Sequence, residues 1–194
     1  GFLTKDFCRV GATKARELAK GAGMTGQTWI KTIGHSEAEK LYDSIQNTRI
    51  IAPNTDCLVP IGSKALLAGL LKEVKAEFFA ASTRPPSVYR GNPFQIEVAI
   101  GYGGGLGKED SAKILLFANR VPLLYSQSSC CSFKAVAETS WKNYGLTQPR
   151  NSIPSGPLVV MVHMVSVWVP FTSESKEAIA DYDEIRKEMK LALQ

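Results

Sequence analysis

The segment from Leu158 to Val169 constrains the fold more than any other stretch of the chain. It is an almost unbroken apolar run, L-V-V-M-V-H-M-V-S-V-W-V, interrupted by His163 and Ser166. A run rich in β-branched residues without alternation favours a strand that is buried on both faces, and it is too short to cross a bilayer. We therefore expect a buried strand here, with His163 as a hydrogen-bonded core histidine.

The rest of the second half predicts further strands and two helices. Phe94, Ile96, Val98 and Ile100 alternate with more polar residues, which indicates a strand with one wetter face. The glycine run at 101–107 predicts a hairpin-like turn to a strand at 113–117, followed by a short strand at 121–125 and a helix at 128–139. A final helix is expected after a capping box formed by Asp181 and Glu184. Residues 77–194 thus predict an α+β module.

The first part of the chain predicts short helices separated by glycines and prolines. Thr13–Lys20 reads as a helix that Gly21 and Gly23 end, and Ser36 with Glu39 forms a capping box for a second helix. Prolines break residues 47–62 into a loop, after which 63–75 resumes a helical pattern. We place a small all-helical module at residues 1–76, with the boundary near Glu77.

Charge is uneven between these two parts. The chain has a net charge of +5 and a pI of about 9.0, which permits polyanionic partners without requiring them. Residues 1–75 hold 11 basic and 7 acidic side chains, against 12 and 11 in residues 76–194. Arg9, Lys14, Arg16 and Lys20 surround a glycine turn that could contact phosphates of DNA. The same spacing fits a solvated basic helix face equally well.

The residues that carry reaction chemistry are sparse. The four cysteines form no C-x-x-C pair, and with two histidines they predict free thiols in an intracellular, reducing compartment and no metal site. No signal peptide is expected, and the chain reads as a piece of a longer protein. The glycine run lacks the spacing of a phosphate-binding loop, and Cys130-Cys131 has no evident base. A self-contained catalytic site is therefore not expected.

Six motifs in order along the chain carry a family resemblance. They are F-C-R-V-G at 7–11, R-G-N-P-F at 90–94, G-Y-G-G at 101–104, F-A-N-R-V-P-L-L-Y at 117–125, W-K-N-Y-G-L at 141–146 and V-P-F-T-S-E-S-K-E-A-I at 169–179. Together they resemble the B subunit of topoisomerase VI. The resemblance implies a helix–two-turns–helix module at residues 1–76 and a transducer domain of GHKL ATPases at 77–194. That domain would be a sheet backed by helices, with a left-handed βαβ crossover and a long, here truncated, final helix.

The resemblance also implies a function. The chain would relay ATP binding and hydrolysis to the DNA-cleaving A subunit of a type II topoisomerase, with ATP and Mg²⁺ bound by a module that these residues do not contain. Lys176 matches the family's switch lysine, which contacts the γ-phosphate of ATP. The implied partners are the A subunit, reached through the C-terminal helix, a second B subunit and double-stranded DNA, with no membrane. The fragment alone would be inactive. It would lie in the cytoplasm or nucleoid of an archaeon or bacterium, or in a plant nucleus.

Two other interpretations compete with this one. A mismatch-repair or gyrase-type GHKL transducer would also supply a strand, a lysine loop and a helix, although the first 75 residues have no natural place there. A stand-alone basic nucleic-acid-binding module would account for the positive first part and the shortage of catalytic groups.

Overall fold

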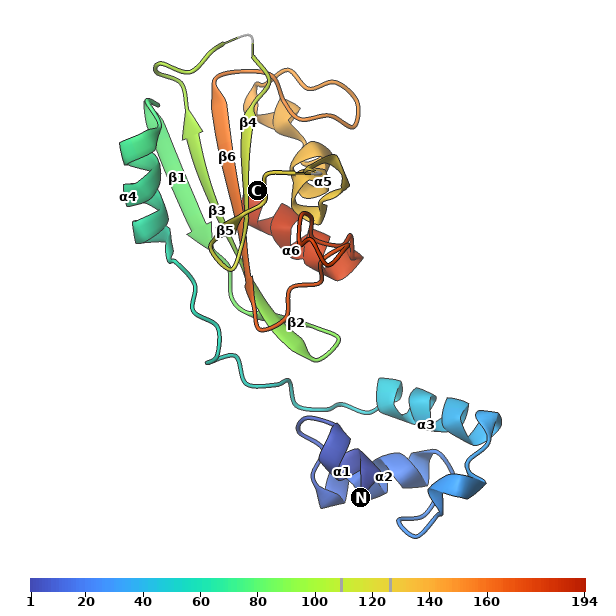
Figure 1. Ribbon diagram of the computed structural model, residues 1–194. Helices are drawn as coiled ribbons and strands as arrows, with labels where there is room; N and C mark the ends of the chain where they lie inside the picture. Colours follow the sequence, from blue (N-terminus) through green and yellow to red (C-terminus); the bar gives the residue numbers. More distant parts are fainter. Residues whose placement is uncertain (109, 126) are drawn as a thin grey trace. The chain divides into compact units, whose positions relative to one another are not determined.

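Residues 1–53 and 54–194 form separate units in the computed structural model, which describes residues 1–108, 110–125 and 127–194. The first unit is helical, as predicted (Figure 1). Its elements are α1 (Phe2–Asp6), α2 (Ala12–Gly21), the 3-10 turn η1 (Ile30–Thr32) and α3 (His35–Asn47). The second unit begins with α4 (Ser63–Glu73) and contains the sheet.

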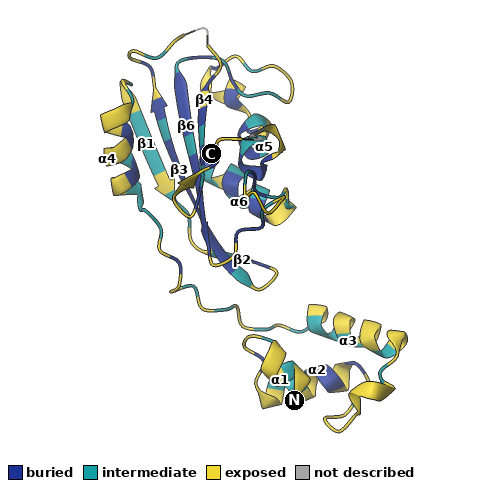
Figure 2. Ribbon diagram, in the orientation of Figure 1, coloured by how far each residue is buried: buried dark blue, intermediate teal, exposed yellow. Residues whose placement is uncertain are grey.

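The first unit has a small core. Its buried apolar residues are Val10, Leu18, Ala19 and Ala22. The Ser44 hydroxyl on α3 donates to the Leu18 carbonyl of α2 at 2.9 Å and joins the two helices. The predicted capping box at Ser36 and Glu39 is wrong in register, because the helix starts earlier and the Glu37 carboxylate accepts the Gly34 N–H at 3.0 Å. Figure 2 shows how much of α3 remains exposed.

The second unit is built on one mixed sheet. Its strands are β1 (Phe78–Thr83), β2 (Ser87–Tyr89), β3 (Asn92–Tyr102), β4 (Lys113–Ala118), β5 (Val121–Pro122) and β6 (Leu158–Ser166). The order is β1-β3-β6-β4-β5, with β2 also paired to β3. The predicted hairpin between β3 and β4 is wrong, because β6 lies between them, antiparallel to β3 and parallel to β4.

Helices cover both faces of this sheet. α4 lies on one face, where Leu66 and Leu70 pack with Ala99 and Val159. The other face carries α5 (Cys131–Glu138), in the connection between β4 and β6, and α6 (Asp183–Leu193) (Figure 1). Short 3-10 turns, η2 (Gln127–Ser129) and η3 (Trp141–Tyr144), flank α5. The central strand β6 is buried on both faces, as the sequence predicts, but it ends at Ser166, short of the predicted Val169, and Val167 and Trp168 after it are exposed.

Because α4 belongs to the second unit, the boundary between the two units lies earlier in the chain than the sequence predicts. The sequence places residues 63–75 in the helical module, but the helix buries its apolar stripe against the sheet and the units divide between Pro53 and Asn54. The prediction that one face of β3 is more exposed to solvent is also wrong, because α4 and the segment before it lie on that face. Gln95, Glu97 and Ala99 on that face are buried. Strands β1 and β2 were not predicted at all.

Candidate functional site

The loop that carries Lys176 is closed at its base by backbone hydrogen bonds. The Thr172 N–H donates to the Ala178 carbonyl at 2.9 Å, and the Ala180 N–H donates to the Pro170 carbonyl at 2.7 Å. Lys176 itself is exposed and adopts φ of +56°, in the left-handed region. Among the described residues it takes part in no ion pair. The structure therefore presents an ammonium group on a loop with a fixed base.

The base of this loop is fixed to α5. The Cys131 N–H donates to the Ile179 carbonyl at 2.9 Å, and the Ile179 N–H donates to the Cys130 Sγ at 3.4 Å. Ala178, Ile179 and both cysteines are buried. Burial, followed by the negative charge of Asp181, raises the pKa of the Cys131 thiol to about 12. Cys131 is thus a packing element and not a nucleophile, and Cys130 is buried beside it.

Asp181 connects the loop to two helices. Its carboxylate accepts from Lys134 Nζ on α5 at 2.9 Å and from Arg186 Nη1 on α6 at 2.6 Å. Burial by itself raises the pKa of Asp181, but the Lys134 hydrogen bond and the Arg186 charge outweigh it and hold the pKa below its ordinary value. The predicted capping box with Glu184 is wrong, since α6 has no side-chain cap and the carboxylate binds these two cations instead.

A second carboxylate, Glu97, lies fully buried on the α4 face of the sheet. It accepts the backbone N–H groups of Ile61 and Gly62, at 2.8 and 2.7 Å, and the Thr83 hydroxyl at 2.9 Å. The fourth partner is His163 Nδ1 at 2.8 Å, on the paired position of β6. Burial raises the pKa of Glu97, but these hydrogen bonds outweigh it and lower the pKa to about 2. The carboxylate is therefore ionised inside the fold.

The protonation of His163 follows from its other nitrogen. Nε2 lies 3.0 Å from the Arg120 backbone N–H, which can only donate. Nε2 must accept, so Nδ1 carries the proton and donates to Glu97. His163 is thus the satisfied core histidine that the sequence predicts. Glu97 was not predicted from the sequence as a site residue. A signal was present, because an ionisable residue in each of two buried strands indicates that the two strands pair.

The basic residues predicted to contact DNA lie on and before α2. Arg9, Arg16 and Lys20 are exposed, and Arg9 adopts φ of +62° in the turn that precedes the helix. Arg16 and Lys20 are one helical turn apart and so share a face. Lys14 instead forms an ion pair with Glu17 at 2.8 Å. Three of the four cations are therefore exposed, and Lys14 is partly neutralised.

The glycine run is a structural turn. Gly104 has φ of +63°, and a Cβ there would lie 2.7 Å from the Lys75 carbonyl oxygen. Its N–H donates to the Glu77 carboxylate at 3.0 Å, and the Gly105 N–H donates to the Lys75 carbonyl at 2.8 Å. These amides are committed to the neighbouring backbone and side chain, so glycine serves close packing here.

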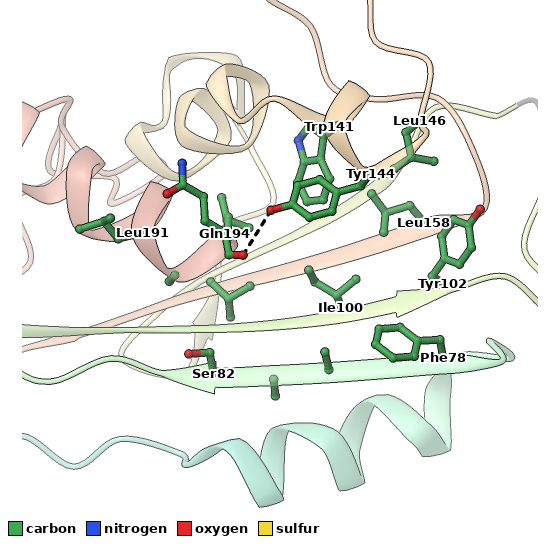
Figure 3. Close-up of a pocket in the computed structure, with 15 residues that line it drawn as sticks. Phe78, Ser82, Ile100, Tyr102, Trp141, Tyr144, Leu146, Leu158, Leu191 and Gln194 are labelled. Carbon is green, nitrogen blue, oxygen red and sulfur yellow. Dashed lines mark hydrogen bonds between the residues drawn. The ribbon is translucent and has the colours of Figure 1, made fainter.

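An apolar groove of about 560 Å³ lies on the α6 face of the sheet, beside the last turn of α6 (Figure 3). Leu191 and Gln194 lie at one side of it and Tyr102 and Phe78 at the other. The Tyr144 hydroxyl donates to the Gln194 carbonyl at 3.2 Å. The described residues that line it include no acidic or basic residue, histidine or cysteine, so the groove suits apolar packing and not a reaction.

Known proteins of one family are similar to the chain over most of its length. A family model described as the transducer of the topoisomerase VI B subunit matches residues 53–194. The B subunit of type 2 DNA topoisomerase 6 from Methanosarcina mazei is 48% identical over 99% of this chain and 31% of its own length. Its counterpart from Archaeoglobus fulgidus is 42% identical over 100% of this chain and 32% of its own length.

A solved structure also resembles part of the chain. The gyrase B subunit of Myxococcus xanthus aligns with 66% of this chain and 37% of its own, at 18% identity and a TM-score of 0.43. The chain spans about a third of the length of the curated relatives it matches. No helix among the described residues has the length and apolar character needed to span a membrane. On the match over residues 53–194, the chain belongs to the topoisomerase VI B subunit family and contains its transducer.

Proposed function

We propose that this chain is the relay part of an ATP-dependent type II DNA topoisomerase. In this proposal the second unit transmits nucleotide binding and hydrolysis, which occur elsewhere in the full-length B subunit, to a DNA-cleaving A subunit through α6. A second B subunit and double-stranded DNA complete the assembly. Residues 1–53, the part of the predicted 1–76 module that forms a separate unit, act as its helix–two-turns–helix module.

The observation that carries the proposal is the placement of Lys176. A lysine ammonium senses a terminal phosphate as a point charge, and the contact is lost when hydrolysis releases that phosphate. The signal reaches the body of the protein only if the loop is fixed at its base. Backbone hydrogen bonds between residues 170 and 180, and the contacts with α5, supply that fixation.

ATP and Mg²⁺ are assigned to the full-length protein and not to these residues. The described glycine-turn amides bond to Lys75 and Glu77, which supports this assignment. The isolated chain should neither bind nor hydrolyse ATP. Calorimetric titration with ATP and Mg²⁺ measures this directly. Micromolar binding would contradict the assignment.

The principal experiment replaces Lys176 in the full-length B subunit assembled with its A subunit. Lys176→Ala should lower ATP turnover and DNA strand passage by at least about tenfold, the effect of losing roughly 1.4 kcal/mol of transition-state interaction. Lys176→Arg should not restore full activity, because the planar guanidinium has a different reach and donor geometry. Lys113→Ala, at an exposed lysine outside the six family motifs, is the matched control and should be normal.

Lys176→Asn separates charge from backbone conformation. Asparagine tolerates the left-handed region that Lys176 occupies, so the loop keeps its path while the charge is removed. The Asn variant should be as inactive as the Ala variant. Normal ATP turnover and strand passage in both variants, with the fold intact, would show that Lys176 is an ordinary surface lysine.

A second, accompanying function is weak DNA contact by the first unit. Exposed Arg9, Arg16 and Lys20 support it, together with Lys14 once its ion pair with Glu17 opens. Phosphate contacts predict affinity that falls steeply with salt and varies little with duplex sequence. Replacing Arg9, Lys14 and Arg16 by alanine should weaken binding of mixed-sequence duplex DNA and flatten its salt dependence. Unchanged affinity would refute this function.

A further inference from the structure

We propose that Asp181 is a positioning residue that makes the Lys176 loop, α5 and α6 move as one body, so that nucleotide state is coupled to strand passage. The inference rests on the proposed function, because it takes Lys176 to be the phosphate sensor. Asp181 then has a role in transmission and not in the chemistry of ATP hydrolysis.

Asp181 lies at the junction between the loop and the last helix. It follows Ala180, whose N–H closes the loop on Pro170, and it precedes α6 by two residues. Between the loop base and the helix, the chain therefore has only a short connection. Because Tyr182 caps α6 without a side-chain hydrogen bond, the cap itself does not fix the angle at which the helix leaves the loop.

The buried apolar face of α6 holds its orientation on the sheet, and charged side chains add a direct connection between the helix and the end of the loop. Asp181 binds Lys134 on α5 and Arg186 on α6, so one carboxylate connects both helices to the end of the loop. Arg186 also contacts Glu138 of α5 at 3.5 Å, and Lys190 of α6 reaches the same Glu138 at 3.2 Å. The side chain of Asp181 is 24% exposed, so solvent and salt screen its ion pairs less than they screen a fully exposed pair, but do not leave them unscreened.

A displacement of Lys176 would be passed to both helices. The loop base is hydrogen-bonded to the start of α5, and Asp181 attaches its end to α5 and α6. A pull on the loop therefore moves the helices with it. Without Asp181, the two residues before α6 can absorb the displacement by rotation of their backbone, as hinge residues at element ends do.

The test uses the full-length B subunit in complex with its A subunit and measures ATP turnover and relaxation of supercoiled DNA in parallel. Asp181→Asn keeps the side-chain volume and removes the charge. It should lower the number of relaxation cycles per ATP hydrolysed by about fivefold, the lower end of typical coupling between sites, while ATP turnover stays within about twofold. Lys134→Met should act in the same direction, since it removes the ion pair between Asp181 and α5 and leaves the one with Arg186.

Asp183→Asn is the matched control. Asp183 also binds Arg186, but its side chain is 88% exposed and forms no ion pair with α5 among the described residues. The Asp183→Asn control should complete the normal number of relaxation cycles per ATP hydrolysed. Hydrogen exchange should show faster exchange of the Ala180 amide in Asp181→Asn than in Asp183→Asn, while the amides of β6 stay protected.

The outcomes separate the inference from the proposed function. A normal number of cycles per ATP in Asp181→Asn and Lys134→Met, with Lys176→Ala inactive, overturns the inference alone. An equal loss of ATP turnover and relaxation in Asp181→Asn also overturns it, because the residue would then act on hydrolysis or folding and not on coupling. If Lys176→Ala is fully active, both the inference and the proposed function fall.

Discussion

Glu97 and Asp181 are two ionised carboxylates that hold different parts of the transducer by different means. Glu97 is buried and satisfied by four donors, among them two backbone amides of the segment before α4. Asp181 is partly exposed and binds two long cationic side chains. Removing the charge of a buried, fully bonded group leaves donors unpaired, whereas exposed partners can turn to water. We therefore expect Glu97 to control stability and Asp181 to control movement.

The largest expected effect comes from Glu97→Gln. The amide preserves the volume, but its NH2 group replaces one of the two accepting oxygens and must then face the N–H of either Ile61 or Gly62. The free energy of unfolding of the second unit should fall by about 3 kcal/mol, measured by chemical denaturation. The control is Glu77→Gln, whose carboxylate also accepts a backbone N–H but is exposed. Its effect should stay within about 0.5 kcal/mol, and equal losses in the two variants would contradict the distinction.

Acid should reproduce the Glu97 effect without a mutation. The pKa of Glu97 is lowered from 4.5 to about 2 in the folded protein, so the folded state binds its proton more weakly than the unfolded state does. The associated stability is present above about pH 4.5 and is lost as the pH falls toward 2, by about 3 kcal/mol in total. Denaturation midpoints measured across this range should fall less in Glu97→Gln. Parallel curves for the two proteins would show that other carboxylates cause the loss.

Asp181→Asn should have a smaller effect on stability. The ion pairs with Lys134 and Arg186 are partly solvated, and such pairs contribute about 0.2–1 kcal/mol. Thermal unfolding at low and high salt should show a small loss that shrinks as salt screens the pairs. A loss as large as that of Glu97→Gln would mean that Asp181 is a stability residue, and the contrast between the two carboxylates would not hold.

The smallest effect is expected at the loop tip. Lys176 is exposed and in the left-handed region, so Lys176→Gly relieves backbone strain while it adds freedom to the unfolded chain. The two effects oppose each other, and the unfolding free energy should change by no more than about 0.5 kcal/mol. A larger loss would show that the Lys176 side chain has a structural role in the loop.

Prediction from sequence succeeded where one stretch of residues decides the outcome. The apolar run around His163, the alternation in β3 and the stripe of Ile185, Met189 and Leu193 in α6 all gave the correct element. It failed where a distant partner decides. Asp181 has the spacing of a helix cap, but Lys134, 47 residues away along the chain, provides a charge that competes for its carboxylate.

The same division holds for the fold and the site as a whole. The sequence by itself determined the buried central strand, the helical and α+β parts, the family, and an exposed lysine between a strand and a helix. Only the tertiary structure decided that β6 lies between β3 and β4, that α4 covers the sheet, and that Glu97 is buried among four donors. The physical reason is that periodicity records which side of an element is apolar, whereas strand order and charge pairing depend on which distant surfaces meet.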